Sequence, residues 1–289
     1  MNKSKVQSPK SKVRKHFAKK SLGQNFLVDQ NIIDKIIFSL NPQKDETIIE
    51  IGAGRGALTK KLVERAGKVL AIEIDRDLIP ILREEFREKE NFALIEQDAL
   101  EIDFKSLVNL QGQARKTKLV ANLPYYISTA ILQHLIQYRY SFSEMVLMLQ
   151  REVVERITAE AGTKERGFLT VLIEAYFEAE KLFDVSPNAF SPVPKVTSSV
   201  MRLITKEFIE NKLLDEKLFR ELVSLGFMQK RKMILNNLKN ATGELQTKIE
   251  KFSDLNELLK KAEIEPQRRA ETLLLEEWID LSNLLSKIF

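Results

Sequence analysis

Thr47-Ile48-Ile49-Glu50-Ile51-Gly52-Ala53-Gly54-Arg55-Gly56 is the stretch that decides the fold. Its first five residues are typical of a buried strand, and the glycines after them let the backbone approach a ligand closely. A helical pattern with Leu58, Leu62 and Val63 on one face follows directly. A strand, a glycine-rich turn and a helix in this order predict one unit of a parallel sheet, with a ligand site at the carboxyl end of the strand.

The same alternation of strand and helix continues along the chain with short loops. Further buried strands are predicted at residues 68–74, 92–95, 118–121 and 145–149. Residues 181–185 and 196–204 add two strands, which we expect to form an antiparallel pair at one edge. The sequence therefore predicts an α/β fold with a mostly parallel, seven-stranded sheet.

Beyond about residue 206 the strand signals stop and helical spacing takes over, for example at Leu218 and Leu222. We expect a small all-helical domain there. The predicted parts are a basic arm (residues 1–20), an α/β domain (21–205) and the helical domain (206–289).

The composition is that of an ordinary globular protein of 289 residues, 44% hydrophobic and 30% charged. The lack of cysteine excludes disulfides and thiolate zinc sites, and two histidines leave little for a histidine-based metal centre, so we expect no metal. The apolar runs are too short to span a bilayer. These features favour a protein of the cytoplasm without a membrane partner.

The first 20 residues hold eight Lys or Arg and no acidic residue, whereas the rest of the chain has 38 basic and 41 acidic residues. A basic arm on a near-neutral body favours contact with a polyanion such as RNA. A solvated tail without a function is an equally good interpretation, and a mitochondrial transit peptide is a weaker one.

Acidic residues mark the ends of three successive strands. Glu50 precedes the glycine loop, as in methyltransferases, Glu73 lies where a ribose-binding acid belongs, and Asp98 follows the next strand. An Asp98 oxygen is suited to accept a hydrogen bond from an adenine amino group. Alone, the Gly52-x-Gly54 pattern also fits a nicotinamide enzyme, and acids at strand ends often only cap helices. The joint pattern favours S-adenosylmethionine.

The tetrapeptide Asn122-Leu123-Pro124-Tyr125 follows the predicted strand at residues 118–121. The Asn122 oxygen can accept a hydrogen bond from an exocyclic amino group, proline stiffens the turn, and Tyr125 offers a face for a base. These properties suit an enzyme that holds a planar amino group and alkylates its nitrogen. The simpler interpretation is a turn after a strand.

With these motifs the chain resembles the ribosomal RNA adenine dimethyltransferase family, whose members dimethylate two adjacent adenines near the 3′ end of small-subunit RNA. The most specific matches are Gly23-Gln24-Asn25-Phe26-Leu27 and Phe190-Ser191-Pro192-x-Pro194-Lys195-Val196. Tyr126 stands where bacterial members commonly have Asn, at a position that varies among relatives. The other matching segments are residues 50–54, 72–75, 97–99, 122–125 and 229–232.

The resemblance implies a Rossmann-like class I methyltransferase fold and S-adenosyl-L-methionine as cofactor. For the flipped target adenine it implies a catalytic group in which Asn122 and the Leu123 carbonyl accept the two amino hydrogens, while Tyr125 and Phe190 stack on the base. Pro124 belongs to this group as well. Phe190, in a proline-rich turn, also fits a position in the core. Implied cofactor contacts are Asn25, Leu27, Glu50, Gly52, Gly54, Glu73, Asp98 and Asn122.

The implied partner is small-subunit ribosomal RNA in a partly assembled subunit, bound by a monomer with a role in subunit biogenesis. Alternatives are a large-subunit RNA methyltransferase of the antibiotic-resistance type, a protein-glutamine methyltransferase, and an RNA- or DNA-binding factor without catalysis. The two specific segments favour the small-subunit enzymes. The expected RNA contacts are Lys195, Lys230, Arg231 and Lys232, with a solvated helix face as the alternative for the last three.

Overall fold

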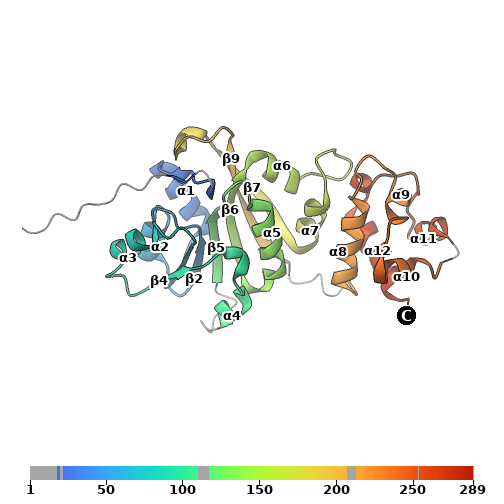
Figure 1. Ribbon diagram of the computed structural model, residues 1–289, viewed down its shortest axis with the longest axis horizontal. Helices are drawn as coiled ribbons and strands as arrows, with labels where there is room; N and C mark the ends of the chain where they lie inside the picture. Colours follow the sequence, from blue (N-terminus) through green and yellow to red (C-terminus); the bar gives the residue numbers. More distant parts are fainter. Residues whose placement is uncertain (1–17, 20–21, 110–116, 207–212, 253, 289) are drawn as a thin grey trace, which may run out of the picture.

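The structure, a computed structural model, describes residues 18–19, 22–109, 117–206, 213–252 and 254–288. The predicted basic arm therefore lies outside the described residues, except for Ala18 and Lys19. Figure 1 shows a sheet with helices on both faces and, beside it, a group of helices that carries the C-terminus. Of the helices described, none combines the length and apolar character that crossing a bilayer requires.

Seven of the described strands form one sheet in the order β4-β3-β2-β5-β6-β9-β7. The first five are parallel, and β9 runs antiparallel to both β6 and β7. The prediction of a mostly parallel seven-stranded sheet is confirmed, with the antiparallel pair at one edge and β9 inserted ahead of β7. The strands are β2 (Thr47–Ile51), β3 (Lys68–Glu73), β4 (Phe92–Glu96), β5 (Thr117–Asn122), β6 (Glu144–Gln150), β7 (Phe177–Val185) and β9 (Ser198–Thr205).

Helices cover both faces of the sheet because its central strands are apolar on both sides; β2, for example, is buried at all five positions. With both faces covered, the strand ends are the places where a ligand can reach the sheet. One face packs against α1 (Gln30–Leu40), α2 (Thr59–Arg65) and α3 (Ile79–Glu85). The other packs against α4 (Phe104–Asn109), α5 (Ser128–Gln137), α6 (Arg151–Ile157) and α7 (Phe168–Tyr176).

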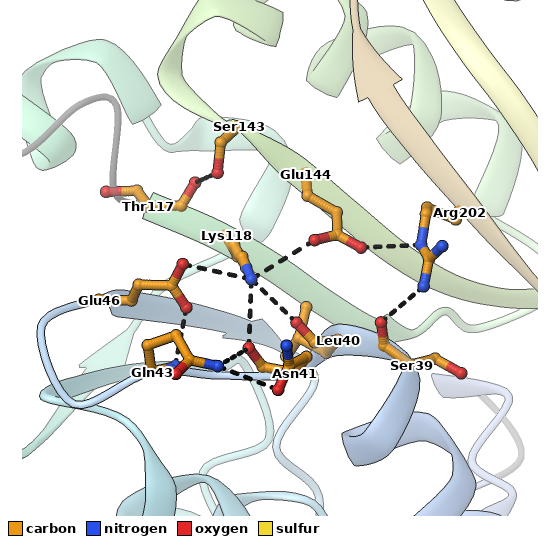
Figure 2. Close-up of polar contacts among 10 residues, drawn as sticks. All are labelled: Ser39, Leu40, Asn41, Gln43, Glu46, Thr117, Lys118, Ser143, Glu144 and Arg202. Atoms are coloured by element: carbon orange, nitrogen blue, oxygen red, sulfur yellow. Dashed lines mark hydrogen bonds and ion pairs between the residues drawn. The ribbon is translucent and has the colours of Figure 1, made fainter.

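A cluster of charged side chains, here called the amino-end network, ties the end of α1 to the amino-end edge of the sheet (Figure 2). Lys118 of β5 lies 3.2 Å from a Glu46 oxygen and 3.5 Å from a Glu144 oxygen, and it donates to two carbonyl oxygens at the end of α1. Arg202 of β9 lies 2.9 Å from Glu144 and donates to the Ser39 carbonyl oxygen at 2.8 Å. The network therefore pairs two cations with two carboxylates and with carbonyl oxygens at the end of α1.

The described residues beyond β9 form helices and no further strand. Arg139 joins the two parts of the molecule: it is 3% exposed, stacks on the rings of Tyr140 and Tyr176, and donates two hydrogen bonds to Glu216 in α8. One apolar core continues from the sheet through α7 into this helical part. Its helices are α8 (Glu216–Gly226), α9 (Ile234–Leu238), α10 (Gly243–Ile249), α11 (Leu255–Lys261) and α12 (Leu275–Ser286).

Candidate active site

A cavity of about 260 Å³ lies at the carboxyl ends of the parallel strands. Its wall includes Gly52 and Gly54 after β2, Glu73 at the end of β3, Asp98 after β4 and Asn122 at the end of β5. Four sequence-predicted strand ends therefore meet in one strand-end cavity, as the parallel arrangement requires.

The glycine loop and Glu73 form a single hydrogen-bonded unit. Gly52 and Gly54 have φ angles of 74° and 59°, in the left-handed region that glycine adopts without strain. The Gly54 amide donates to Glu73 at 2.8 Å, and the other Glu73 oxygen accepts from the amides of Ile74 and Asp75 at 3.0 and 2.9 Å. Burial raises the pKa of Glu73 while these backbone bonds oppose the rise. The carboxylate is thus held in one orientation at the cavity wall.

Asp98 combines both roles that the sequence allows. One oxygen, Oδ1, accepts from the Leu100 amide at 2.9 Å and caps the short helix at Ala99–Glu101. The other, Oδ2, accepts no hydrogen bond from the residues that the structure describes. A capping residue with a remaining acceptor in a cavity wall can bind a ligand amino group without losing its structural bond.

Asn122 is oriented by the N-terminal segment. Its side-chain nitrogen donates to the Asn25 carbonyl oxygen at 3.3 Å, and its side-chain oxygen accepts no hydrogen bond within the described part of the chain. The Leu123 amide donates to Met148 of β6 at 3.1 Å, which fixes the start of the tetrapeptide. Because the bond from the nitrogen fixes the rotation of the planar amide, the Asn122 oxygen is a pre-oriented hydrogen-bond acceptor beside the cavity.

Tyr125 forms part of the wall between the cavity and a second, more open space. Its hydroxyl lies 2.6 Å from the hydroxyl of Ser198, a fully buried residue at the start of β9. Burial raises the pKa of Tyr125, with the Ser198 bond acting in the opposite direction. The ring is therefore a neutral phenol that is held by its hydroxyl end.

The N-terminal segment closes one side of the strand-end cavity. Lys19 and Gln24 both bind the Asp75 carboxylate, at 2.5 and 2.6 Å. Burial by itself raises the pKa of Asp75, but the bonds from Lys19 and Gln24 outweigh it and lower the pKa to about 2. Asp75 belongs to the matching segment 72–75, but its contact with the N-terminal segment was not predicted; the Gly23-Gln24-Asn25 motif was the available signal for its partner.

Three predicted site residues lie behind the wall instead of in it. Leu27 and Phe190 are paired across a two-stranded sheet, β1 (Phe26–Leu27) with β8 (Phe190–Ser191), and both are buried in the apolar core. Phe190 thus occupies a core position, the second interpretation that its sequence context allows. Glu50 is 1% exposed and accepts a 2.6 Å hydrogen bond from the Thr59 hydroxyl, and burial raises its pKa to about 8.

The second space, here called the outer hollow, has a volume of about 990 Å³. It shares Gly23, Gln24, Asn25 and Tyr125 with the strand-end cavity. Lys195, a predicted RNA contact, lies in its wall together with Arg55, which the sequence did not single out.

The predicted basic cluster Lys230, Arg231 and Lys232 lies outside both spaces, in the exposed turn after α8. The Lys230 ammonium donates to the Lys164 carbonyl oxygen at 3.1 Å, so this turn of the helical part touches the loop between α6 and α7. Within the described residues no cluster of His, Asp or Glu side chains that could hold a metal ion is found.

Comparison with known proteins gives one consistent family. The model of a family described as "Ribosomal RNA adenine dimethylase" matches residues 15–281. A Clostridium botulinum protein named "Ribosomal RNA small subunit methyltransferase A" is 45% identical over 269 residues, which cover 93% of this chain and 94% of the relative. A Lactococcus lactis protein of the same name is 40% identical over 268 residues, covering 92% and 90%.

Solved structures agree with the fold. The crystal structure of a dimethyladenosine transferase from Plasmodium falciparum superposes with a TM-score of 0.74 at 27% identity, covering 89% of this chain and 95% of that one. The 23S rRNA methyltransferase ErmE gives a TM-score of 0.63 at 24% identity, with 91% and 100% covered. The latter likeness concerns the fold alone.

Proposed function

This chain belongs to the ribosomal RNA adenine dimethylase family, and on that premise we propose how its site works and on what RNA. It is an rRNA adenine dimethyltransferase with a methyltransferase fold. We propose that the strand-end cavity binds S-adenosyl-L-methionine. The reaction proposed is N6,N6-dimethylation of two adjacent adenines near the 3′ end of small-subunit RNA. The relatives named for the small subunit, at 40–45% identity, support this choice over the large-subunit and glutamine alternatives.

The donor set of the cavity fits the proposed cofactor. The left-handed glycines leave room for a ligand against the backbone, and Glu73 and Asp98 offer carboxylate acceptors for ribose hydroxyls and an adenine amino group. Both charged side chains in the described wall are acidic, which suits a cofactor that carries a positive sulfonium. Asn25 would cover the cofactor from the N-terminal side, whereas Leu27 and Glu50 would support the wall from behind.

Asn122 carries the mechanism, because its oxygen is the pre-oriented acceptor beside the cavity. When bound, S-adenosylmethionine supplies the methyl group, whose bond to sulfur breaks as the adenine nitrogen bonds to the carbon. The Asn122 oxygen and the Leu123 carbonyl would accept the two amino hydrogens and direct the nitrogen lone pair at that carbon. The methylated nitrogen then loses one proton to water, so no strong base is required.

Tyr125 would stack on the flipped adenine from the outer hollow, which is the more open of the two spaces. Phe190 is in the core, and it would reach the other face of the base only if the 190–196 segment moved. Lys230, Arg231 and Lys232, all exposed, are proposed as phosphate contacts farther along the RNA. The proposed substrate is a partly assembled subunit in the cytoplasm, bound by one copy of the chain.

The test uses labelled S-adenosylmethionine and small ribosomal subunits that lack this modification. Labelled N6,N6-dimethyladenosine in the 3′-terminal RNA fragment is the expected product. Cofactor binding without any label in that RNA would contradict the proposed substrate and direct attention to another amino or amide group.

A further inference from the structure

The two spaces at the carboxyl-end edge carry opposite charge. In the described wall of the strand-end cavity the charged side chains are Glu73 and Asp98, whereas in that of the outer hollow they are Arg55 and Lys195. The spaces meet at Tyr125 and at residues 23–25. An anionic ligand would therefore be repelled by the cavity and attracted to the hollow.

Arg55 is held in place by an aromatic ring. Its guanidinium carbon lies 4.3 Å from the centroid of the Phe26 ring. Phe26 is 8% exposed and is fixed by its strand pairing with Ser191. A side chain at Gly54 would come within 3.3 Å of that ring, so the ring packs directly on the glycine loop. The position of Arg55 is thereby tied to the loop that lines the cavity.

An arginine that lies over a ring face can present N–H donors along the edge of its guanidinium plane. That geometry matches the paired oxygens of a phosphate, which a planar fork binds with two parallel hydrogen bonds. Lys195 lies in the segment after β8, and its ammonium has no ion-pair or hydrogen-bond partner among the described residues. The compact charge of the Lys195 ammonium and the planar Arg55 guanidinium can therefore bind neighbouring phosphates together.

We propose that Arg55 and Lys195 bind the phosphates that flank the target adenosine, at the mouth through which the base reaches Asn122 and Tyr125. This inference rests on the proposed function and deepens it by assigning the RNA-binding side of the same site. Arg55 follows Gly54 directly, so a phosphate bound to it has a defined distance from the glycine loop. Arg55 and Lys195 thus act as positioning residues for the target nucleotide.

The first test measures binding of an RNA hairpin that carries two adjacent adenosines in its loop, over a range of KCl concentrations. Arg55→Gln and Lys195→Gln should each weaken binding about tenfold and reduce the slope of log affinity against log salt by about one. Affinity for S-adenosylmethionine should stay within about twofold, because neither side chain lines the strand-end cavity.

The matched control is Arg87→Gln. Arg87 is 66% exposed and precedes β4. It therefore lies at the amino ends of the parallel strands, away from the outer hollow, and its substitution should not change RNA affinity. Arg55→Lys retains the charge and loses the planar fork; it should keep the salt slope and recover only part of the affinity.

The second test neutralises the RNA. A methylphosphonate on each side of the target adenosine should weaken wild-type binding, and Arg55→Gln should then cause little further loss because its phosphate partner is already uncharged. If the methylphosphonates and Arg55→Gln each reduce RNA affinity by a factor that does not depend on the other change, the inference is wrong. Unchanged RNA affinity in Arg55→Gln, a loss confined to cofactor affinity, or wild-type protein that fails to bind the hairpin at low salt would also overturn it.

These outcomes separate the inference from the proposed function. Wild-type protein that binds the RNA through Arg55 yet never methylates ribosomal RNA would refute the function and leave the phosphate contact standing. Normal methylation with an Arg55→Gln variant that binds RNA like the wild type would do the reverse.

Discussion

Strand β5 joins two contrasting regions, with Lys118 near its start in the amino-end network and Asn122 at its end in the strand-end cavity. Lys118 contacts two carboxylates and two carbonyl oxygens, so its bonding capacity is filled by protein. Asn122 lines the strand-end cavity, donates from its side-chain nitrogen to Asn25, and has a side-chain oxygen that accepts no hydrogen bond from the described residues. Buried polar groups that satisfy one another stabilise a fold, whereas oriented groups with remaining capacity can bind a ligand.

The same contrast distinguishes carboxylates. Glu144 is used by Lys118 and Arg202 at the amino-end edge. At the carboxyl ends of the strands, one Asp98 oxygen accepts a hydrogen bond from the Leu100 amide, and the other accepts none from the described residues. The amino-end network should therefore respond to mutation in stability, and the carboxyl-end edge in binding and turnover.

The largest effect is expected for Asn122→Ala. Removing the pre-oriented acceptor should reduce single-turnover methylation about 100- to 1,000-fold, because the hydrogen bond is strongest as the nitrogen becomes a nucleophile. Cofactor affinity, measured by calorimetry, should remain largely intact. A variant that methylates at the wild-type rate would contradict the catalytic role proposed for Asn122.

Lys118→Met should act on stability instead. It leaves Glu46 and Glu144 close together without their shared cation, and we expect a loss of roughly 3 kcal/mol in the free energy of unfolding by chemical denaturation. Methylation per folded molecule should be unchanged. The matched control is Lys60→Met, which breaks an ion pair whose partners are about half exposed and should cost under about 1 kcal/mol. Equal losses in the two variants would contradict the structural role of the network.

Asp98→Asn tests the remaining oxygen at the carboxyl-end edge. The amide oxygen can still cap Leu100, but its NH₂ group would face the adenine amino group, and cofactor affinity should fall about tenfold. Asp103→Asn is the control, because Asp103 caps Ser106 at 3.0 Å outside the cavity wall. If both variants bind the cofactor like the wild type, Asp98 is a helix cap and nothing more.

Glu50→Gln examines a carboxyl group that lies beside the strand-end cavity but, like the carboxylates of the amino-end network, is bonded to a protein group, here the Thr59 hydroxyl. Burial raises the pKa of Glu50 from 4.5 to about 8, so the folded protein retains a proton that the unfolded chain has lost. Wild-type stability should therefore fall as the pH rises from about 5 to 8, and the variant should lack this component. The melting temperature of the wild type should drop by roughly 6 °C more than that of the variant. Parallel pH profiles would show that Glu50 is not the titrating group.

Several features of the site were predictable because they depend on local order along the chain. A strand followed by Gly52-x-Gly54 leads to a strand end with left-handed glycines, and this holds whatever lies beside it. Because β2 to β5 are parallel, their carboxyl ends meet, and Glu73, Asp98 and Asn122 share a cavity as predicted.

The positions of Leu27 and Phe190 were not predictable from either segment alone. Each was expected at the ligand, yet their pairing across β1 and β8 turns both side chains into the core. The contact between Lys19 and Asp75 likewise joins residues 56 positions apart. Such pairings depend on where distant strands meet, which local periodicity does not contain.

By itself, the sequence determined the α/β class, the glycine loop, the order of strand ends and the family, because these follow from periodicity and from short motifs. Only the tertiary structure decided which of the motif residues line the strand-end cavity and which lie behind its wall. It also placed Arg55 on Phe26, at the rim of a basic hollow beside an acidic cavity. The physical reason is that orientation and charge environment are set by packing between segments far apart in the chain.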